Sequence, residues 1–198
     1  MVLGDDYRDY VAHFRAGTTR SHQEHGEVFM REVAEALKTL PRIFLDLVLP
    51  RLPGLAARLE QGGRVLDVGC GGGWALVQIA ERFPRTSCVG VDLEPYSVEL
   101  AQRLIQERGL ADRCQARAQS VDQLGGHFLI FDEAYPETDA ALQTMPARFA
   151  ALAQWYELTW GNVVDTRTAL HERCRQTGFE VAEETTFSRF TITVAQKA

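Results

Sequence analysis

A glycine-rich turn between two apolar segments is the sequence feature that most constrains this chain. Residues 65–73 read Val-Leu-Asp-Val-Gly-Cys-Gly-Gly-Gly, and the segment Trp74–Phe83 that follows is a predicted helix, stopped by Pro84. Glycines after a strand let the backbone approach a ligand closely. The first amides of the next helix point toward the same place. We therefore predict a buried strand, a ligand-binding glycine loop (residues 69–73) and a helix, in this order.

The segments that follow repeat the alternation of strand and helix. Further strands are predicted at Ser87–Val91 and Arg113–Ala118, with a helix over Pro95–Arg108 that ends at Gly109. This order indicates an α/β fold with a mostly parallel sheet and right-handed crossovers. The later segments are predicted as one strand (128–131), two helices (145–156 and 166–177) and two closing strands (179–184 and 189–194).

Residues 1–60 differ in character from the rest of the chain. Apolar residues recur at near-helical spacing over residues 27–40, and Pro41 can open another helix that Pro50 and Pro53 end. We expect two regions: a helical N-terminal extension or lid over residues 1–60, and an α/β domain over residues 61–198.

Composition restricts the class of protein. Of the 198 residues, 45% are hydrophobic and 24% are charged, which is typical of a globular protein in water. The formal net charge of -6 argues against a general affinity for nucleic acid. No apolar run is long enough for a membrane helix, and the acidic start is unlike a signal peptide. We expect neither nucleic acid nor membrane as a partner.

Cysteine and histidine spacing gives no metal site. The four cysteines are scattered, which predicts a reduced, cytoplasmic setting. His22 and His25 can share a helical face, but no further ligand at a supporting spacing accompanies them, so no metal is expected.

Two carboxylates accompany the glycine loop. Asp67 lies two residues before Gly69, and Asp92 ends the second predicted strand. An acid at the end of that strand can accept hydrogen bonds from both hydroxyls of a ribose. The third glycine of a dinucleotide fingerprint would fall on Trp74, which disfavours an NAD(P) enzyme, and no G-K-[ST] phosphate clamp follows. The expected ligand carries a ribose and needs no phosphate clamp.

These residues resemble a known family. Asp67-Val68-Gly69-Cys70-Gly71-Gly72-Gly73 and Val89-Gly90-Val91-Asp92-Leu93 look like motif I and the acidic second-strand loop of class I S-adenosylmethionine-dependent methyltransferases. The resemblance covers roughly residues 64–198. It implies a Rossmann-like, doubly wound sheet, S-adenosylmethionine as the cofactor, and methyl transfer to an acceptor.

The resemblance also implies roles for single residues. Gly69, Gly71 and Gly73 would shape the pocket for the methionine part of the cofactor, with Cys70 as a small residue that fits. Asp67 would lie near the amino group, Asp92 would hold the ribose, and Leu93 would pack against adenine. Gln119 stands where many members place an Asp at the adenine amine, and Ser120 follows it. The amide oxygen of Gln119 can still accept a hydrogen bond, without a charge.

The connection after the third strand departs from the family. The family's seven strands have the order 3-2-1-4-5-7-6, and residues 125–131 resemble its fifth strand. A parallel crossover needs about a dozen or more residues, and too few precede this segment. We therefore expect a shortened sheet that lacks the fourth strand, in which the Phe128–Phe131 strand pairs directly with the Val65 strand. A natural deletion, an internally truncated copy and complementation by a second chain are all compatible with this loss.

The N-terminal part resembles a narrower group. Phe14-Arg15-Ala16-Gly17, His25–Phe29 and Leu52-Pro53-Gly54 are similar to the linker and lid of bacterial small-molecule methyltransferases. Those proteins carry a winged-helix dimerisation module before this point, and we expect this chain to lack it. A homodimer is one candidate assembly.

No residue is identified as a catalytic base. Asp132, Glu133 and Tyr135 end the 128–131 strand, where they can touch substrate or cap a turn. His25, His127 and Asp132 are candidate bases, and the aromatic residues Trp155, Tyr156 and Trp160 can line a pocket or pack in the core. We expect methyl transfer to a small-molecule acceptor. The alternatives are a catalytically silent or oligomer-complemented binder of S-adenosylmethionine and, third, an NAD(P)-binding enzyme.

Overall fold

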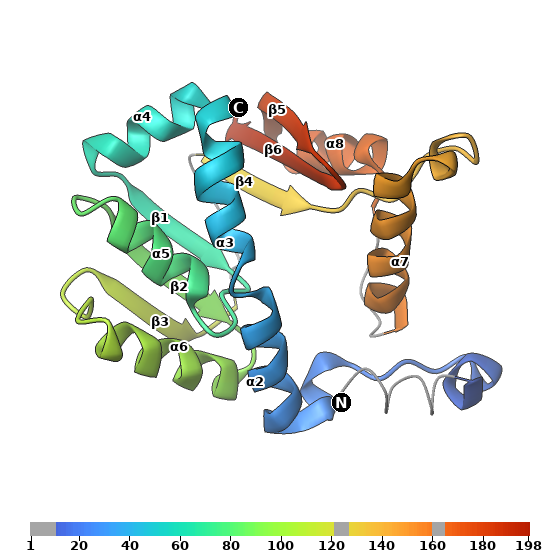
Figure 1. The fold of residues 1–198 in the computed structure, drawn as a ribbon, viewed down its shortest axis with the longest axis horizontal. Coiled ribbons are helices and arrows are strands. Elements are labelled where there is room, and N and C mark those ends of the chain that lie inside the picture. Colours follow the sequence, from blue (N-terminus) through green and yellow to red (C-terminus); the bar gives the residue numbers. More distant parts are fainter. Residues whose placement is uncertain (1–10, 121–126, 160–164) are drawn as a thin grey trace. The chain divides into compact units, whose positions relative to one another are not determined.

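The computed structural model describes residues 11–120, 127–159 and 165–198. These residues form two compact units (Figure 1). One contains residues 22–120, and the other contains residues 127–198 together with residues 11–21. The division into an extension over 1–60 and a domain over 61–198 stays a prediction. Of the helices in the described ranges, none combines the length and the apolar character needed to cross a membrane.

The first unit contains the predicted alternation of strands and helices. Strands β1 (Arg64–Val68), β2 (Ser87–Asp92) and β3 (Cys114–Ala118) form a parallel sheet in the order β1-β2-β3. Helices α5 (Trp74–Arg82) and α6 (Pro95–Glu107) make the two crossovers. Glu94 caps α6, because its Oε1 accepts a hydrogen bond from the backbone N–H of Tyr96 at 3.2 Å. The predicted α/β architecture is confirmed in this unit.

The core of the first unit lies between the sheet and these two helices. Leu76 and Val77 from α5 and Ile105 from α6 pack with Cys88 and Cys114, which are register partners on β2 and β3. All five side chains are buried. The helices therefore pack on the sheet through a continuous apolar layer, which fixes the ends of the strands relative to one another.

Helical segments fill residues 22–61, as predicted. In chain order they are η1 (His22–His25), α2 (Gly26–Leu37), α3 (Leu40–Ile43), η2 (Phe44–Val48), η3 (Leu49–Arg51) and α4 (Pro53–Gln61). Helix α2 runs close to the glycine loop, since a Cβ at Gly72 would lie 2.8 Å from the Cβ of Ala34. The side-chain amide of Gln78 on α5 also donates to the carbonyl of Lys38 at 2.8 Å. These helices therefore belong to the unit that carries the glycine loop.

The second unit contains an antiparallel sheet. Strands β4 (His127–Asp132), β5 (Phe179–Phe187) and β6 (Phe190–Lys197) have the order β4-β6-β5, so β6 is central. Residues 190–195 of β6 are all buried, and the strand has a neighbour on each edge. Helices η4 (Ala141–Gln143), α7 (Met145–Thr159) and α8 (Arg167–Gln176) belong to this unit, as do the helical residues 11–16.

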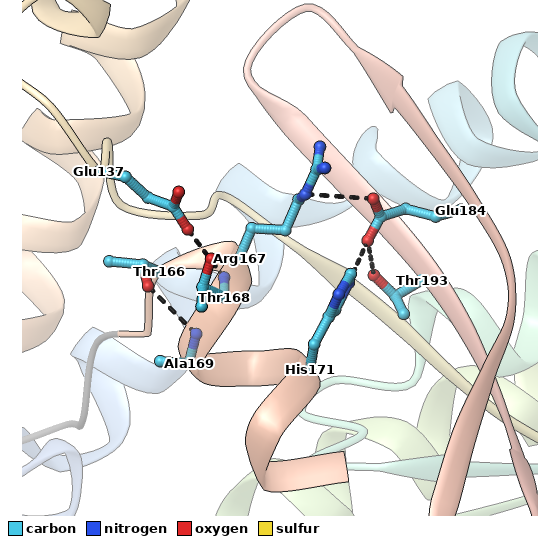
Figure 2. A network of polar contacts seen from close by, with 8 residues as sticks. All are labelled: Glu137, Thr166, Arg167, Thr168, Ala169, His171, Glu184 and Thr193. Carbon is cyan, nitrogen blue, oxygen red and sulfur yellow. Dashed lines mark hydrogen bonds and ion pairs between the residues drawn. The ribbon is translucent and has the colours of Figure 1, made fainter. Parts of the chain in front are cut away.

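One carboxylate joins helix α8 to this sheet (Figure 2). Glu184 Oε2 on β5 lies 2.6 Å from His171 Nε2 on α8 and accepts a hydrogen bond from Thr193 Oγ1 on β6 at 3.2 Å. Its Oε1 forms an ion pair with Arg167 Nε at 3.3 Å. Glu184 is only 17% exposed, so these donors offset the cost of removing its charge from water. The arrangement positions α8 across the β5–β6 hairpin.

The start of α8 is capped twice. Thr166 Oγ1 accepts from the backbone N–H of Ala169 at 3.2 Å, and Glu137 Oε1 accepts from that of Thr168 at 2.8 Å (Figure 2). Hydrogen bonds from the side chain and then the backbone N–H of Thr168 lower the pKa of the Glu137 carboxyl. The segment after β4 is therefore attached to the beginning of α8.

The predicted pairing of the Phe128–Phe131 strand with the Val65 strand is wrong. Strand β4 pairs with β6 along its whole length, from His127↔Gln196 to Asp132↔Thr191, and β1 pairs with β2. In the described ranges the strands form two three-stranded sheets and not one. The physical reason is the connection over residues 119–126, which is too short for an ordinary parallel crossover, whereas β6 offers a buried antiparallel partner for every residue of β4.

Candidate functional site

The glycine loop is held in a left-handed backbone conformation. Gly69, Gly71 and Gly73 have φ angles of +74°, +49° and +79°. The N–H groups of Gly69 and Cys70 both donate to the carbonyl of Val91 on β2, at 2.8 and 3.1 Å. A Cβ at Gly69 or Gly71 would meet nothing within 4 Å. These two glycines are therefore required by their backbone angles, and the space beside them is open.

The carboxylate of Asp92 bridges two backbone segments. Its Oδ2 accepts a hydrogen bond from Gly71 N–H at 2.8 Å, and its Oδ1 accepts one from Glu94 N–H at 2.9 Å. A carboxylate has about four acceptor positions. Each oxygen of Asp92 therefore keeps acceptor capacity for a ligand after both backbone bonds are made.

Asp67 is a carboxyl in an unfavourable environment. Burial at the end of β1, and to a lesser degree the charge of Asp92, raise its pKa from 3.8 to about 6. Burial and the same two carboxylates also raise the pKa of the Cys70 thiol to about 12. A thiol that stays protonated is a poor nucleophile, which favours a packing role for Cys70. A cation beside Asp67 would restore the ionised form of this carboxyl.

The remaining predicted residues follow β2 and β3. Leu93 comes directly after Asp92 and is 67% exposed. Gln119 N–H donates to the carbonyl of Asp92 at 2.9 Å, and the side chains of Gln119 and Ser120 are exposed. The structure thus brings the predicted cofactor residues together at the carboxyl ends of three adjacent parallel strands, where α/β folds bind ligands. These residues are Asp67, Gly69, Cys70, Gly71, Gly73, Asp92, Leu93, Gln119 and Ser120.

Two supporting glycines were not singled out from the sequence. A Cβ at Gly90 on β2 would lie 2.7 Å from Cys70 Sγ and 2.6 Å from Leu76 Cδ1, so the loop packs directly on this bare backbone. Gly72 makes the equivalent close approach to α2. A glycine in the middle of a predicted strand is the signal that identifies Gly90, because such glycines mark close backbone contacts.

The candidate residues after β4 have structural partners. Asp132 Oδ1 accepts from Glu133 N–H at 2.7 Å and from Gln154 Nε2 at 3.3 Å, which is the turn-capping alternative. Glu133 forms an ion pair with Arg189 at 2.8 Å, and Tyr135 N–H donates to the carbonyl of Asp165 at 3.1 Å. These contacts assign no catalytic base.

The other candidates add no base. The His25 ring stacks on Phe29 with centroids 4.2 Å apart. The side chains of His127, Trp155 and Tyr156, and all of Trp160, lie outside what the structure describes.

Comparison with known proteins gives a family match over this region. The model of the family described as "Methyltransferase domain" matches residues 65–172, more than half of the chain. Aklanonic acid methyltransferase DauC of Streptomyces sp. (strain C5) is 46% identical over 98 residues, which are 49% of this chain and 40% of that protein. A tRNA1(Val) (adenine(37)-N6)-methyltransferase of Yersinia pestis (strain Pestoides F) is 32% identical over 88 residues, 44% of this chain and 33% of that protein. The matches span less than half of the length of these relatives.

Solved structures share the fold. The O-methyltransferase NcsB1 from neocarzinostatin biosynthesis, in complex with S-adenosylmethionine and 2-hydroxy-5-methyl naphthoic acid, superposes with a TM-score of 0.68 at 17% identity. LaPhzM superposes with a TM-score of 0.72 at 18% identity. Both alignments cover 100% of this chain and 70% of the other. They confirm the predicted Rossmann-like α/β fold. Together with the family match over residues 65–172, they show that this chain belongs to the methyltransferase-domain family.

Proposed function

We propose that the chain binds S-adenosylmethionine on the loops after β1, β2 and β3 and transfers its methyl group to a small-molecule acceptor. The observation that carries the proposal is the convergence of Asp67 and Asp92 on one open glycine loop. Two carboxylates beside a left-handed glycine loop match a ligand with a cation at one end and a diol further along.

The residues present fit this cofactor. Burial, and then the neighbouring charge of Asp92, raise the pKa of the Asp67 carboxyl, and the cofactor's ammonium beside it would favour the ionised form. Asp92 keeps acceptor positions for the two ribose hydroxyls. Leu93 exposes an apolar surface suited to the face of adenine, and the Gln119 amide oxygen can accept from the adenine amine.

The bound cofactor supplies an already activated methyl group, so the chemical demands on the protein are small. The chain's own residues orient the two reactants and exclude water, which is the usual contribution of a protein to a displacement of this kind. No base is required unless the acceptor must lose a proton. The described residues place no group in that role.

A small organic acid or related metabolite is the acceptor class we favour. DauC acts on aklanonic acid by its name, and NcsB1 holds a naphthoic acid, which supports this class for a chain of the same fold. The net charge of -6 favours a small molecule over the tRNA of the other relative. The four cysteines are free and buried, which supports a reduced, cytoplasmic setting. A homodimer stays a prediction.

One observation favours a second candidate, a cofactor-binding protein without activity of its own. In the described ranges β1 has β2 as its neighbour on one edge and no strand on the other. A sheet with this open edge can bind the cofactor and still require a partner chain to complete the acceptor site.

Calorimetric titration with S-adenosylmethionine and S-adenosylhomocysteine tests the proposal, with NAD⁺ as the control ligand. We expect saturable binding of the first two and none of NAD⁺. An acceptor screen with the same protein then separates the two candidates: methyl transfer supports the enzyme, and binding without transfer to any acceptor supports the inactive binder. A folded protein that binds neither sulfur ligand would refute both.

A further inference from the structure

The side chain of Asp92 is engaged within the protein before any ligand is considered. Its Oδ2 accepts the N–H of Gly71, a residue 21 positions earlier in the chain, at 2.8 Å. Its Oδ1 accepts the N–H of Glu94 at 2.9 Å. Hydrogen bonds from backbone amides to a carboxylate are charge-assisted and stronger than those between neutral groups.

The bond between Asp92 and Gly71 adds a side-chain contact to the backbone bonds that hold the glycine loop. Gly69 and Cys70 donate their N–H groups to the backbone carbonyl of Val91, so these two bonds do not depend on any side chain. Gly72 and Gly73 pack against Ala34 and Ala101. Gly71 has open space around the position of a Cβ and a φ of +49°. The Cys70–Gly71 peptide is held at both polar groups: Gly73 N–H donates to the Cys70 carbonyl at 2.9 Å, and Gly71 N–H donates to the side chain of Asp92. Asp92 therefore helps to set the orientation of this peptide.

We propose that Asp92 is a positioning residue for the glycine loop as well as the ribose-binding acid, and that it couples the two halves of the cofactor site. Through Gly71 it shapes the cradle for the amino-acid part, and through its free acceptor positions it binds the nucleoside part. This inference rests on the proposed function, because it assigns both halves to S-adenosylmethionine.

Two ligands separate these two roles. S-adenosylhomocysteine contains both halves, whereas 5′-methylthioadenosine keeps the adenosine and the sulfur and lacks the amino-acid part. If Asp92 acts on the ribose alone, Asp92→Ala weakens both ligands by the same factor. If Asp92 also positions the loop, the affinity for S-adenosylhomocysteine falls further than that for 5′-methylthioadenosine. The additional loss should be about tenfold for one charge-assisted hydrogen bond. Asp92→Asn keeps one acceptor oxygen. We therefore expect its affinity ratio for the two ligands to lie between the ratios of the wild type and the alanine variant.

Leu93→Ala is the matched control. Leu93 is the neighbouring residue, is 67% exposed, and faces only the nucleoside part in the proposed arrangement. This variant should weaken both ligands by one common factor, so that their affinity ratio stays at the wild-type value. A change in this affinity ratio therefore measures the effect of a variant on the position of the glycine loop, separately from a loss of affinity common to both ligands.

Amide hydrogen exchange of the ligand-free protein gives a second readout. We expect the Gly71 amide to be protected in the wild type and to exchange faster in Asp92→Ala, with Gly69 and Cys70 unchanged. An unprotected Gly71 amide in the wild type overturns the inference even where a variant fails to fold. Equal factors for the two ligands in a folded variant also overturn it, while leaving the proposed function intact. Absence of S-adenosylhomocysteine binding by the wild type would instead refute the proposed function.

Discussion

The buried carboxyl of Asp67 makes a sharp prediction about stability. Its pKa in the folded protein is about 6, against 3.8 in an unperturbed chain. A difference of about two pKa units corresponds to about 3 kcal/mol at a pH above both values. Ionised Asp67 therefore destabilises the ligand-free protein, and we expect Asp67→Asn to raise the free energy of unfolding by about 3 kcal/mol at pH 7.5.

The sign of the pH dependence follows from the same shift. Because the folded pKa lies above the unfolded one, the folded state binds more protons between pH 3.8 and about 6. The wild type therefore loses stability as the pH rises through this window, and Asn at position 67 removes that loss. The advantage of the variant should fall to about half at pH 5 and vanish below both pKa values.

Urea unfolding of the wild type and Asp67→Asn at pH 5 and pH 7.5 measures this difference. The control is Asp112→Asn, because Asp112 is exposed in the turn before β3 and its replacement should change stability by at most about 0.5 kcal/mol. An Asp67→Asn variant that is no more stable than the wild type at pH 7.5, or equally stabilised at both pH values, would refute the reasoning. The same variant should bind S-adenosylmethionine more weakly, since the proposed partner of the ammonium is gone.

Three further outcomes are expected from contacts elsewhere. Gly73→Ala should lower the free energy of unfolding by about 2–5 kcal/mol in chemical denaturation, because the residue has a left-handed φ and its new Cβ would lie 2.8 Å from that of Ala101. Gly109→Ala is the control: Gly109 also has a left-handed φ but has open space around it, so this variant should cost only about 1–2 kcal/mol. Glu184→Ala should lower stability by about 1–3 kcal/mol in thermal unfolding, since its donors on α8 and β6 lose their shared acceptor; an unchanged midpoint would show that they find other partners. Cys88, 1% exposed and with a pKa raised to about 12, should react with a thiol reagent only after unfolding, and fast reaction of the folded protein at pH 8 would contradict its burial.

The parts of the fold that the sequence predicts are those with short-range signals. The glycines after β1, the proline at the start of α6 and Gly109 after α6 each mark an element boundary within a few residues. The sequence also predicts that Asp67 and Asp92 lie near each other. Both are at the ends of strands in an alternating strand–helix pattern, and such strand ends meet at one edge of a parallel sheet. Most of the candidate site therefore follows from local pattern and topology.

The features that the sequence does not predict are contacts between distant residues. The partner of β4 depends on which strand lies beside it, and the apolar run over β4 does not specify that strand. The bond between Gly71 and Asp92, and the approach of Ala34 to Gly72, join residues 21 and more positions apart without any matching motif. Such contacts depend on how the elements pack against one another, and the periodicity of apolar residues in the sequence predicts only the elements themselves.

The central place of β6 has a consequence for the order in which the chain is made. Both neighbours of this strand, β4 and β5, precede it in the sequence. During synthesis, β4 therefore leaves the ribosome long before the strand that it pairs with, and its apolar residues stay unpaired until residues 190–197 emerge. The sheet of the first unit needs nothing beyond residue 118 and can form much earlier. A ribosome that pauses shortly before residue 190 would hold a chain whose first sheet can be complete while the second lacks its central strand.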